Sequence, residues 1–405
     1  MPSALPAGQS APRDGSLPEL ALHEIPRRPF GIYIHVPFCT TRCGYCDFNT
    51  YTAAELGSEP GASRGGYVEA AIQELDLAAR VLGPETPQIS TIFVGGGTPT
   101  VLPPDDLGRL ITAIRGRFGL LEDAEVTTES NPESVDAASL YRLRELGFNR
   151  ISFGMQSVVP HVLATLDRVH SPGRPQQAIA ESKSAGFANT SLDLIYGTPG
   201  ESQADWQASL GAAIAAAPEH ISAYALIVEE GTRLAARIRR GELPPPDDDD
   251  LADKYLIADE RLGAAGYTAY EVSNWATSSA TRCQHNLGYW RSYHWWGIGP
   301  GAHSHIGGVR WWNVKHPRAY ASRLAEGLSP AYAREVLTPE ERRVERILLE
   351  LRLTDGLATS LLTSTERGRL ADLRTRGVAD VEDGNLILTR TGRLLVDGVI
   401  RELVD

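Results

Sequence analysis

Short apolar, β-branched runs alternate with longer amphipathic stretches from about residue 30 to residue 228. The short runs predict strands at 31–36, 89–96, 124–130, 150–155, 189–197 and 220–228. The stretches between them predict helices at 67–82, 104–118, 133–147, 174–186 and 203–216. Strands and helices that alternate in this way are typical of a parallel α/β sheet. Because the pattern has six units where a closed barrel has eight, it predicts a partial, TIM-like (β/α)6 barrel.

Unusual polar motifs follow five of the predicted strands. Cys39, Cys43 and Cys46 come after the first strand, and the glycine-rich GGGTPT at 95–100 ends the second. The ends of the third and fourth strands and the middle of the fifth then carry Glu129, Gln156 and Asp193. In a parallel barrel the loops that follow the strands meet at one face, where chemistry is concentrated. We therefore expect these residues to share one site.

The rest of the chain divides by composition into a tail, a linker and two further segments. We expect residues 1–26 to be a flexible tail, 27–240 the barrel, and the proline- and aspartate-rich stretch 241–250 an exposed linker. Residues 251–335 form a cap segment dense in Trp, Tyr and His. Residues 336–405 read as helices around a hairpin, which predicts a small winged-helix-like α+β module. Acidic residues outnumber arginines in that module and it has no lysine, so DNA binding has little electrostatic support.

Composition narrows the class of protein. The net charge of −12 argues against nucleic acid or an anionic membrane as a partner. The N-terminus has no continuous apolar stretch, so we expect no signal peptide, no integral membrane segment and a cytoplasmic location. Only 4 cysteines occur in 405 residues, and three of them lie in CTTRCGYCDF at 39–48. In a reducing compartment such a group indicates metal binding or redox chemistry rather than disulfides.

Three clustered thiolates suit zinc, copper(I) or an iron–sulfur cluster. Structural zinc needs four ligands, and a Cys3His site would have to recruit the distant Cys283 or His285. A [4Fe–4S] cluster with three protein ligands leaves one iron open to bind a small molecule. The residues leave both readings open.

The motif C-x3-C-x2-C after a first strand, with Tyr45 before the last cysteine, resembles the radical S-adenosylmethionine (SAM) superfamily. The similarity extends over nearly the whole chain through YIHVPFC, GGGTPT, ESNP, SFGMQS, LDRVH, DLIYGTPG and YEVSN. These motifs resemble the branch that contains oxygen-independent coproporphyrinogen III dehydrogenase and the HemW heme chaperones. The resemblance implies a [4Fe–4S] cluster on Cys39, Cys43 and Cys46, with SAM chelated at the open iron.

The resemblance also implies how SAM is held. Gly96, Gly97 and Thr98 would let the backbone approach the methionine end closely. By the same resemblance, Glu129 would accept hydrogen bonds from the ammonium group of SAM, and Arg168 would bind its carboxylate. Gln156 and Asp193 would bind the ribose hydroxyls. Tyr33 and Phe48 are expected to pack beside the cluster and the adenosyl group. His35 fits a buried strand histidine as well as a functional residue.

Two functions within the branch remain open. Dehydrogenases carry a further cysteine where this chain has Phe48, whereas the chaperones share CDF and an HNxxYW motif, here HNLGYW at 285–290. The resemblance makes His285 the first candidate for an axial heme ligand, with His294, His303 and His305 as alternatives; the competing reading is a hydrogen-bonded core histidine. A chaperone would bind heme and deliver it to apo-hemoproteins, with SAM and the cluster gating transfer or dimerisation. Its implied partners are the recipient, a protein reductant and a second copy in a homodimer. Whether the chain is itself an enzyme stays open.

Overall fold

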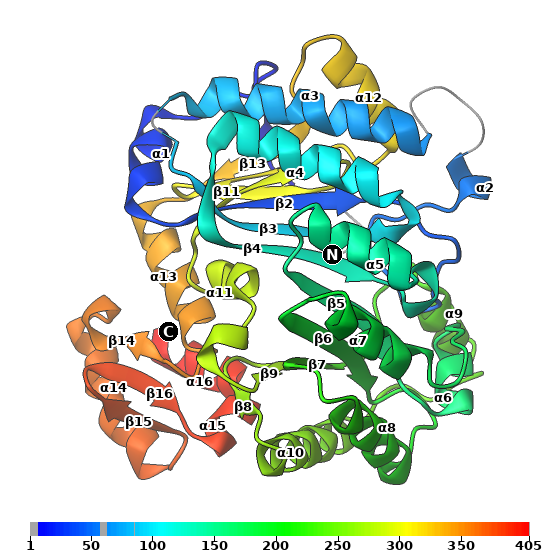
Figure 1. The fold of residues 1–405 in the computed structure, drawn as a ribbon. Helices are drawn as coiled ribbons and strands as arrows, with labels where there is room; N and C mark the ends of the chain where they lie inside the picture. Colours follow the sequence, from blue (N-terminus) through cyan, green and yellow to red (C-terminus); the bar gives the residue numbers. More distant parts are fainter. Residues whose placement is uncertain (1–6, 57–62, 85, 405) are drawn as a thin grey trace.

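A mixed sheet of thirteen strands organises the computed structural model, which describes residues 7–56, 63–84 and 86–404. Its centre consists of six parallel strands in chain order. These are β2 (Phe30–Val36), β3 (Ile89–Gly96), β4 (Leu120–Ser130), β5 (Arg150–Gln156), β6 (Asn189–Tyr196) and β7 (His220–Ala225). The six strands curve into an arc (Figure 1), as the apolar runs predict. The partial (β/α)6 barrel is thus confirmed.

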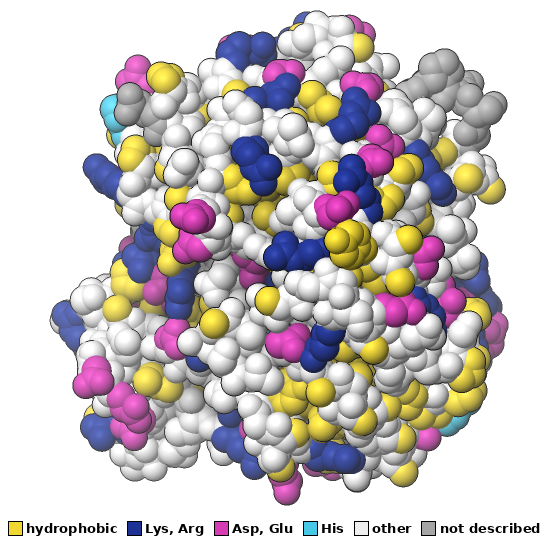
Figure 2. Space-filling view, viewed as in Figure 1, with side chains coloured by type: hydrophobic (Ala, Val, Ile, Leu, Met, Phe, Trp, Pro, Cys, Tyr) yellow, Lys and Arg dark blue, Asp and Glu magenta, His cyan; other side chains and the backbone are white. Residues whose placement is uncertain are grey.

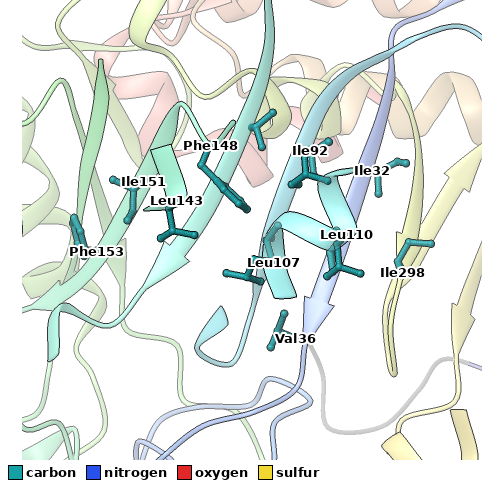
Figure 3. Packing of buried hydrophobic residues seen from close by; sticks show 14 of the residues in the cluster. Ile32, Val36, Ile92, Leu107, Leu110, Leu143, Phe148, Ile151, Phe153 and Ile298 are labelled. Carbon is teal, nitrogen blue, oxygen red and sulfur yellow. The ribbon is translucent and has the colours of Figure 1, made fainter. Parts of the chain in front are cut away.

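Helices between the strands cover the outer face of the arc. They are α3 (Arg64–Leu82), α4 (Pro104–Phe118), α5 (Ala137–Glu145), α7 (Arg174–Ser184) and α8 (Gln203–Ala216). Leu107 and Leu110 of α4 pack toward Ile32 and Ile92 of the sheet (Figure 3). Helix α4 has proline at its first position, aspartates in its first turn and arginines in its last, and these residues suit the helix dipole. Short helices α2 (Ala53–Leu56), α6 (Pro160–Thr165) and α9 (Arg233–Arg239) lie on the loops that follow strands.

The segment predicted as a cap extends both edges of the barrel sheet. Strand β10 (His294–Ile298) runs parallel to β2, and β11 (His303–Ile306), β12 (Val309–Asn313) and β13 (Ala331–Val336) continue antiparallel. At the other edge β9 (Asn274–Ala276) pairs with β7, and β8 (Thr268–Ala269) pairs with β9. Helices α11 (Gln284–Trp290) and α12 (Pro317–Ala325) complete this segment. It is therefore continuous with the barrel rather than a layer placed on top of it.

The expectation of a flexible tail is wrong for residues 7–26, while residues 1–6 lie outside the described residues. Strand β1 (Gln9–Ser10) pairs with the edge strand β13, and α1 (Glu19–Glu24) buries Ala21. An exposed edge strand accepts a partner through its backbone, so the tail needs no strand-like sequence to add to it. The aspartates of the predicted linker also have a structural place. Asp247 caps α10 (Asp248–Ala264), whose first turn holds Asp248, Asp249 and Asp250.

The C-terminal module has its own hydrophobic core, built on Ile347, Leu373 and Leu386 among others. Its elements are α13 (Pro339–Glu350), β14 (Leu357–Ala358), α14 (Ser364–Thr375), β15 (Ala379–Glu382), β16 (Asn385–Leu388), α15 (Arg390–Leu394) and α16 (Val396–Val404). Asp383 and Gly384 have φ of 48° and 82°, as the hairpin turn between β15 and β16 requires. The module lies beside α10 and α11 (Figure 1), and Arg390 pairs with Asp259 of α10 at 3.0 Å. The predicted α+β module is consistent with this structure.

Basic and acidic side chains are interspersed over the face drawn in Figure 2, so it shows no continuous basic field for nucleic acid. Within the described ranges, none of the helices combines the length and the apolar character needed to cross a membrane.

Candidate functional site

A pocket of about 440 Å³ opens at the carboxyl ends of the parallel strands. Eleven of the thirteen residues predicted for the site line it together. They are Cys39, Cys43, Cys46, Phe48, Gly96, Gly97, Thr98, Glu129, Gln156, Arg168 and Asp193. The other two, Tyr33 and His285, do not line it. Five separate strand ends thus contribute to one cavity, as expected for a barrel.

The cysteine loop is fixed by backbone hydrogen bonds on both of its sides. The Cys39 N–H donates to the carbonyl of Tyr51 at 3.0 Å, which closes the loop on itself. The Gly44 N–H donates to the carbonyl of Leu166 at 3.0 Å, and the Gly44 carbonyl accepts from the N–H of Leu234 at 2.8 Å. The loop is therefore tied to the segments that follow β5 and β7. Such ties hold the three sulfur atoms over the pocket without a fourth cysteine.

The glycine motif after β3 provides room beside the first cysteine. Gly96 has a φ of +108°, which a residue with a side chain rarely adopts. A Cβ on Gly97 would lie 2.5 Å from the carbonyl oxygen of Phe38 and 3.0 Å from the sulfur of Cys39. The Thr98 N–H donates to the same Phe38 carbonyl at 2.8 Å. Glycine at position 97 is thus a steric requirement of the cysteine loop.

Two buried carboxyl groups form the floor of the pocket. Glu129 accepts a hydrogen bond from the Gly96 N–H at 3.1 Å, and burial followed by the neighbouring Asp193 raises its pKa to about 8. Asp193 accepts from the Ser152 hydroxyl at 2.8 Å, and its pKa is also raised, mainly by burial. Within the described part of the chain, the hydrogen bonds to these two carboxyl groups come from a backbone N–H and a hydroxyl rather than from a positively charged side chain. An ammonium group and hydroxyls from a ligand would satisfy both.

Gln156 and Arg168 complete the polar part of the lining. Gln156 has a φ of 64°, and an irregularity in the β5–β6 pairing directs this residue into the pocket. The Arg168 guanidinium donates to the Gly154 carbonyl at 3.0 Å, to His170 Nε2 at 3.3 Å and to Cys43 Sγ at 3.4 Å. A planar guanidinium group held in this way can bind a carboxylate through two parallel hydrogen bonds. It also places a positive charge against one of the cysteine sulfurs.

The donor set fits an open [4Fe–4S] cluster better than zinc. Among the described residues, no three His, Cys, Asp or Glu side chains converge closely enough to hold a single metal ion. A cubane does not require such convergence, because each cysteine binds a different iron. The Cys3His zinc alternative fails for another reason. Cys283 lies at the other end of the barrel, where its thiol donates to Glu125 at 3.5 Å.

The structure places His285 as a hydrogen-bonded interior histidine outside the cysteine pocket, so its role as a heme ligand stays a prediction. It lies on α11 beneath the starts of the strands, near Gly31 and Thr91, while α2, α6 and α9 mark the opposite end of the barrel (Figure 1). Its Nδ1 pairs with the Thr91 hydroxyl at 2.8 Å and its Nε2 with the Tyr289 hydroxyl at 2.9 Å. Burial lowers its pKa to about 3, so the ring is neutral. Both ring nitrogens have hydrogen-bond partners here, so an iron bound at His285 would have to replace one of these hydrogen bonds.

The three alternative histidines are also held within the sheet extension. His294 pairs with the Glu24 carbonyl at 3.0 Å and His305 with the Tyr293 carbonyl at 3.0 Å. His303 stacks on Trp312 with 5.7 Å between ring centroids. None of the three lines the pocket above the cysteines.

The two predicted aromatic neighbours of the cluster have different positions. Tyr33 does not line the pocket; it stacks on Phe93 and is hydrogen-bonded to His35 Nδ1 at 3.0 Å, and its contact with the adenosyl group stays a prediction. His35 bridges Tyr33 and the carbonyl of Asn49, at 2.9 Å, and so supports the cysteine loop from beneath. Phe48 does line the pocket, yet half of its side chain is exposed at the mouth.

Sequence reasoning missed the end of β7 and the segment that follows it. Tyr224 of β7 and Leu226 and Ile227 beyond it line the pocket, and Tyr224 and Ile227 are exposed. The apolar run 220–228 predicts one continuous strand, but β7 ends at Ala225. The available signal was the position of this run, since loops after barrel strands face the site.

Comparison with known proteins agrees with this geometry. The model of the radical SAM superfamily matches residues 33–213. Heme chaperone HemW of Mycobacterium tuberculosis is 51% identical over 388 residues, which cover 96% of this chain and 97% of that protein. The chain belongs to the HemW family. Another member of the family, HemW of Bacillus subtilis, is 34% identical over 90% of this chain and 96% of its own length.

A solved structure supports the fold of this HemW family member over nearly its whole length. Coproporphyrinogen III oxidase (HemN) from Escherichia coli, described as a radical SAM enzyme, superposes with a TM-score of 0.79 at 23% identity. The match covers 98% of this chain and 96% of that one. At this identity the similarity establishes the architecture alone, including the sheet extension and the C-terminal module.

Proposed function

We propose that this chain is a radical SAM heme chaperone, which binds a [4Fe–4S] cluster, SAM and heme and delivers heme to apo-hemoproteins. The observation that carries the proposal is the convergence of the three cysteines, the glycine cradle and the polar floor in one pocket. That pocket occurs in a chain 51% identical, over nearly its full length, to proteins named heme chaperone HemW. The residues that line the pocket and the family therefore point to the same function.

Each part of the pocket has a separate task in this proposal. Cys39, Cys43 and Cys46 hold the cluster, whose open iron and reducing electron supply radical chemistry to SAM when both are bound. The residues of the chain bind and orient the cofactor. Glu129 accepts hydrogen bonds from its amino group, and the remaining polar contacts come from Gln156, Arg168 and Asp193.

The environment of the floor also controls its charge. With a pKa near 8, the Glu129 carboxyl is protonated in most molecules at neutral pH when the pocket has no bound cation. A ligand ammonium group beside it lowers that pKa and stabilises the carboxylate. Arg168 keeps its positive charge throughout and is braced by Gly154 and His170. We also propose a protein reductant and a homodimer as partners, with apo-hemoproteins as recipients.

The proposal is tested with anaerobically reconstituted protein. We expect about four irons per chain, and loss of the broad visible absorbance in the triple variant Cys39→Ser, Cys43→Ser, Cys46→Ser with an unchanged circular dichroism spectrum. Hemin added to the wild type should give a Soret band, and apomyoglobin added afterwards should take up the heme. Retention of the cluster by the triple variant would refute the site.

One assay separates the chaperone from the enzyme of the same branch. The wild type is incubated anaerobically with coproporphyrinogen III, SAM and dithionite, and carbon dioxide and 5′-deoxyadenosine are measured. We expect no decarboxylation, because Phe48 occupies the position where dehydrogenases of the branch carry a cysteine. Turnover of coproporphyrinogen III would replace the chaperone proposal by the enzymatic one.

A further inference from the structure

Exposed apolar side chains gather at the mouth of the cysteine pocket. Among its lining residues, Ile227 is 69% exposed, Phe48 50% and Tyr224 41%. Large apolar residues are costly to leave in water, and a group of them around one cavity marks a binding surface. We call Phe48, Tyr224 and Ile227 the apolar rim.

The rim is built from the two ends of the six-strand arc. Phe48 belongs to the cysteine loop after β2, whereas Tyr224 and Ile227 belong to β7 and the segment that follows it. These ends are joined directly, because the Leu234 N–H donates to the Gly44 carbonyl at 2.8 Å. Tyr45 also packs against the buried cluster that contains Leu226. The rim is therefore a fixed feature of the barrel mouth rather than a set of unrelated loop residues.

The pocket has two chemically different parts. Its floor holds Glu129, Gln156, Arg168 and Asp193, which suit a zwitterionic ligand with hydroxyl groups. Phe48 and Ile227 carry no polar side-chain group and are at least half exposed, whereas Tyr224 offers the rim its ring and has its hydroxyl near Ser222 and Asp193. A flat, apolar ring system suits the rim, and aromatic side chains are effective contacts for such rings. Arg42 also lines the pocket, but its guanidinium is already paired with Glu55 at 3.3 Å and donates to the Thr50 carbonyl.

A second cavity lined by aromatic side chains is a poorer place for a porphyrin. It lies under α11, encloses about 270 Å³ and is lined by His285, Tyr289 and Trp295. That volume is below the range of about 300–1,000 Å³ usual for ligand sites. His285 is buried, and both of its ring nitrogens are bound to other side chains. Binding there would require the protein to give up these hydrogen bonds.

We propose that the iron porphyrin cargo docks on the apolar rim at the mouth of the cysteine pocket. This inference rests on the proposed function and names the place where the cargo binds. No histidine or methionine is among the described residues that line the pocket. The porphyrin is therefore held through its ring, without a histidine or methionine on the iron. Such binding suits a carrier, since an acceptor that provides an axial histidine can take the heme.

Hemin titration of the reconstituted protein tests the proposal. Ile227→Asp and Phe48→Asp place a charge on each side of the mouth, at exposed positions where folding tolerates it. We expect each to raise the Kd for hemin at least tenfold when compared at equal iron content per chain, and we expect the cluster absorbance of Ile227→Asp to stay unchanged. Leu20→Asp is the matched control, because Leu20 is 81% exposed on α1 and does not line the pocket. Its Kd should stay within threefold of the wild-type value.

His285→Gln tests the competing location, since glutamine keeps hydrogen-bonding capacity at that position. We expect hemin binding within threefold of wild type. The rim is refuted if Ile227→Asp and Phe48→Asp bind hemin normally, if His285→Gln alone loses it with an intact circular dichroism spectrum, or if Leu20→Asp weakens binding equally. Failure of the wild type to bind hemin would refute the proposed function itself, which is a different result.

Discussion

Glu74 of α3 is a buried carboxyl that holds the extended edge of the sheet to the barrel. Its Oε2 accepts from the Gly299 N–H at 2.8 Å and the Tyr320 hydroxyl at 2.6 Å, and its Oε1 accepts from the Asn313 amide at 2.8 Å. Burial is the largest influence on its pKa and raises it from 4.5 to about 7, although these hydrogen bonds oppose the rise. The perturbation we consider is Glu74→Gln, which keeps the shape of the side chain and removes its titration.

The expected effect depends on pH with a definite sign. Below about pH 4.5 the carboxyl is protonated in both the folded and the unfolded chain, so it contributes no pH dependence. As the pH rises from 4.5 to 7, the unfolded chain loses the proton first, and the folded state is progressively destabilised. At about 1.4 kcal/mol for each pH unit between the two pKa values, the loss is about 3 kcal/mol. Because glutamine does not titrate, the Glu74→Gln variant does not show this loss of stability as the pH rises.

Urea unfolding of wild type and Glu74→Gln at pH 5 and pH 8, followed by tryptophan fluorescence, measures the effect. We expect the free energy of unfolding of the variant minus that of wild type to be about 2–3 kcal/mol larger at pH 8 than at pH 5, because part of the loss has already occurred at pH 5. The control is Asp76→Asn on the same helix. Asp76 is 59% exposed and pairs with Arg117 at the surface, so its effect should stay below about 0.5 kcal/mol at both pH values. An equal effect of Glu74→Gln at both pH values would refute the reasoning.

Three further predictions concern the site. Gly97→Ala should prevent cluster assembly, measured as iron content after reconstitution, because its Cβ would lie 2.5 Å from the Phe38 carbonyl oxygen. Gly116→Ala is the control and should assemble the cluster normally, because its Cβ meets open space on α4. A full cluster in Gly97→Ala would contradict the steric requirement for glycine at position 97. Glu129→Gln should weaken SAM binding at least tenfold in calorimetry; unchanged affinity would remove Glu129 from the cofactor site. Tyr33→Phe should lower the free energy of unfolding by about 1–3 kcal/mol, because it leaves a buried nitrogen of His35 without its hydrogen bond. It should leave the affinity for SAM unchanged, because Tyr33 does not line the pocket. Weaker SAM binding would instead support the predicted contact between Tyr33 and the adenosyl group.

The strands, most helices and the grouping of eleven site residues followed from the sequence because their signals are local. Apolar periodicity marks each strand of the barrel, and in parallel sheets the polar residues at strand ends necessarily face the same side. Gly97 could be predicted as a site residue because only a residue without a side chain lets the backbone approach the cysteine loop this closely. The place of β1 could not be predicted, because its pairing depends on the free edge of β13, about 320 residues away.

The sequence by itself determined which chemical groups the protein has: three cysteines at a spacing for a cluster, a glycine cradle and a set of polar residues at successive strand ends. Only the tertiary structure decided what the distant groups do. The sequence does not distinguish His285 and Tyr33 from residues that face a ligand. In the structure both lie in the barrel interior, and their polar atoms are hydrogen-bonded to other side chains. The apolar rim depends on closure of the arc, which brings the loops after β2 and β7 to one mouth. The physical reason is that burial and hydrogen-bond partners arise from contacts between remote segments, which local patterns do not encode.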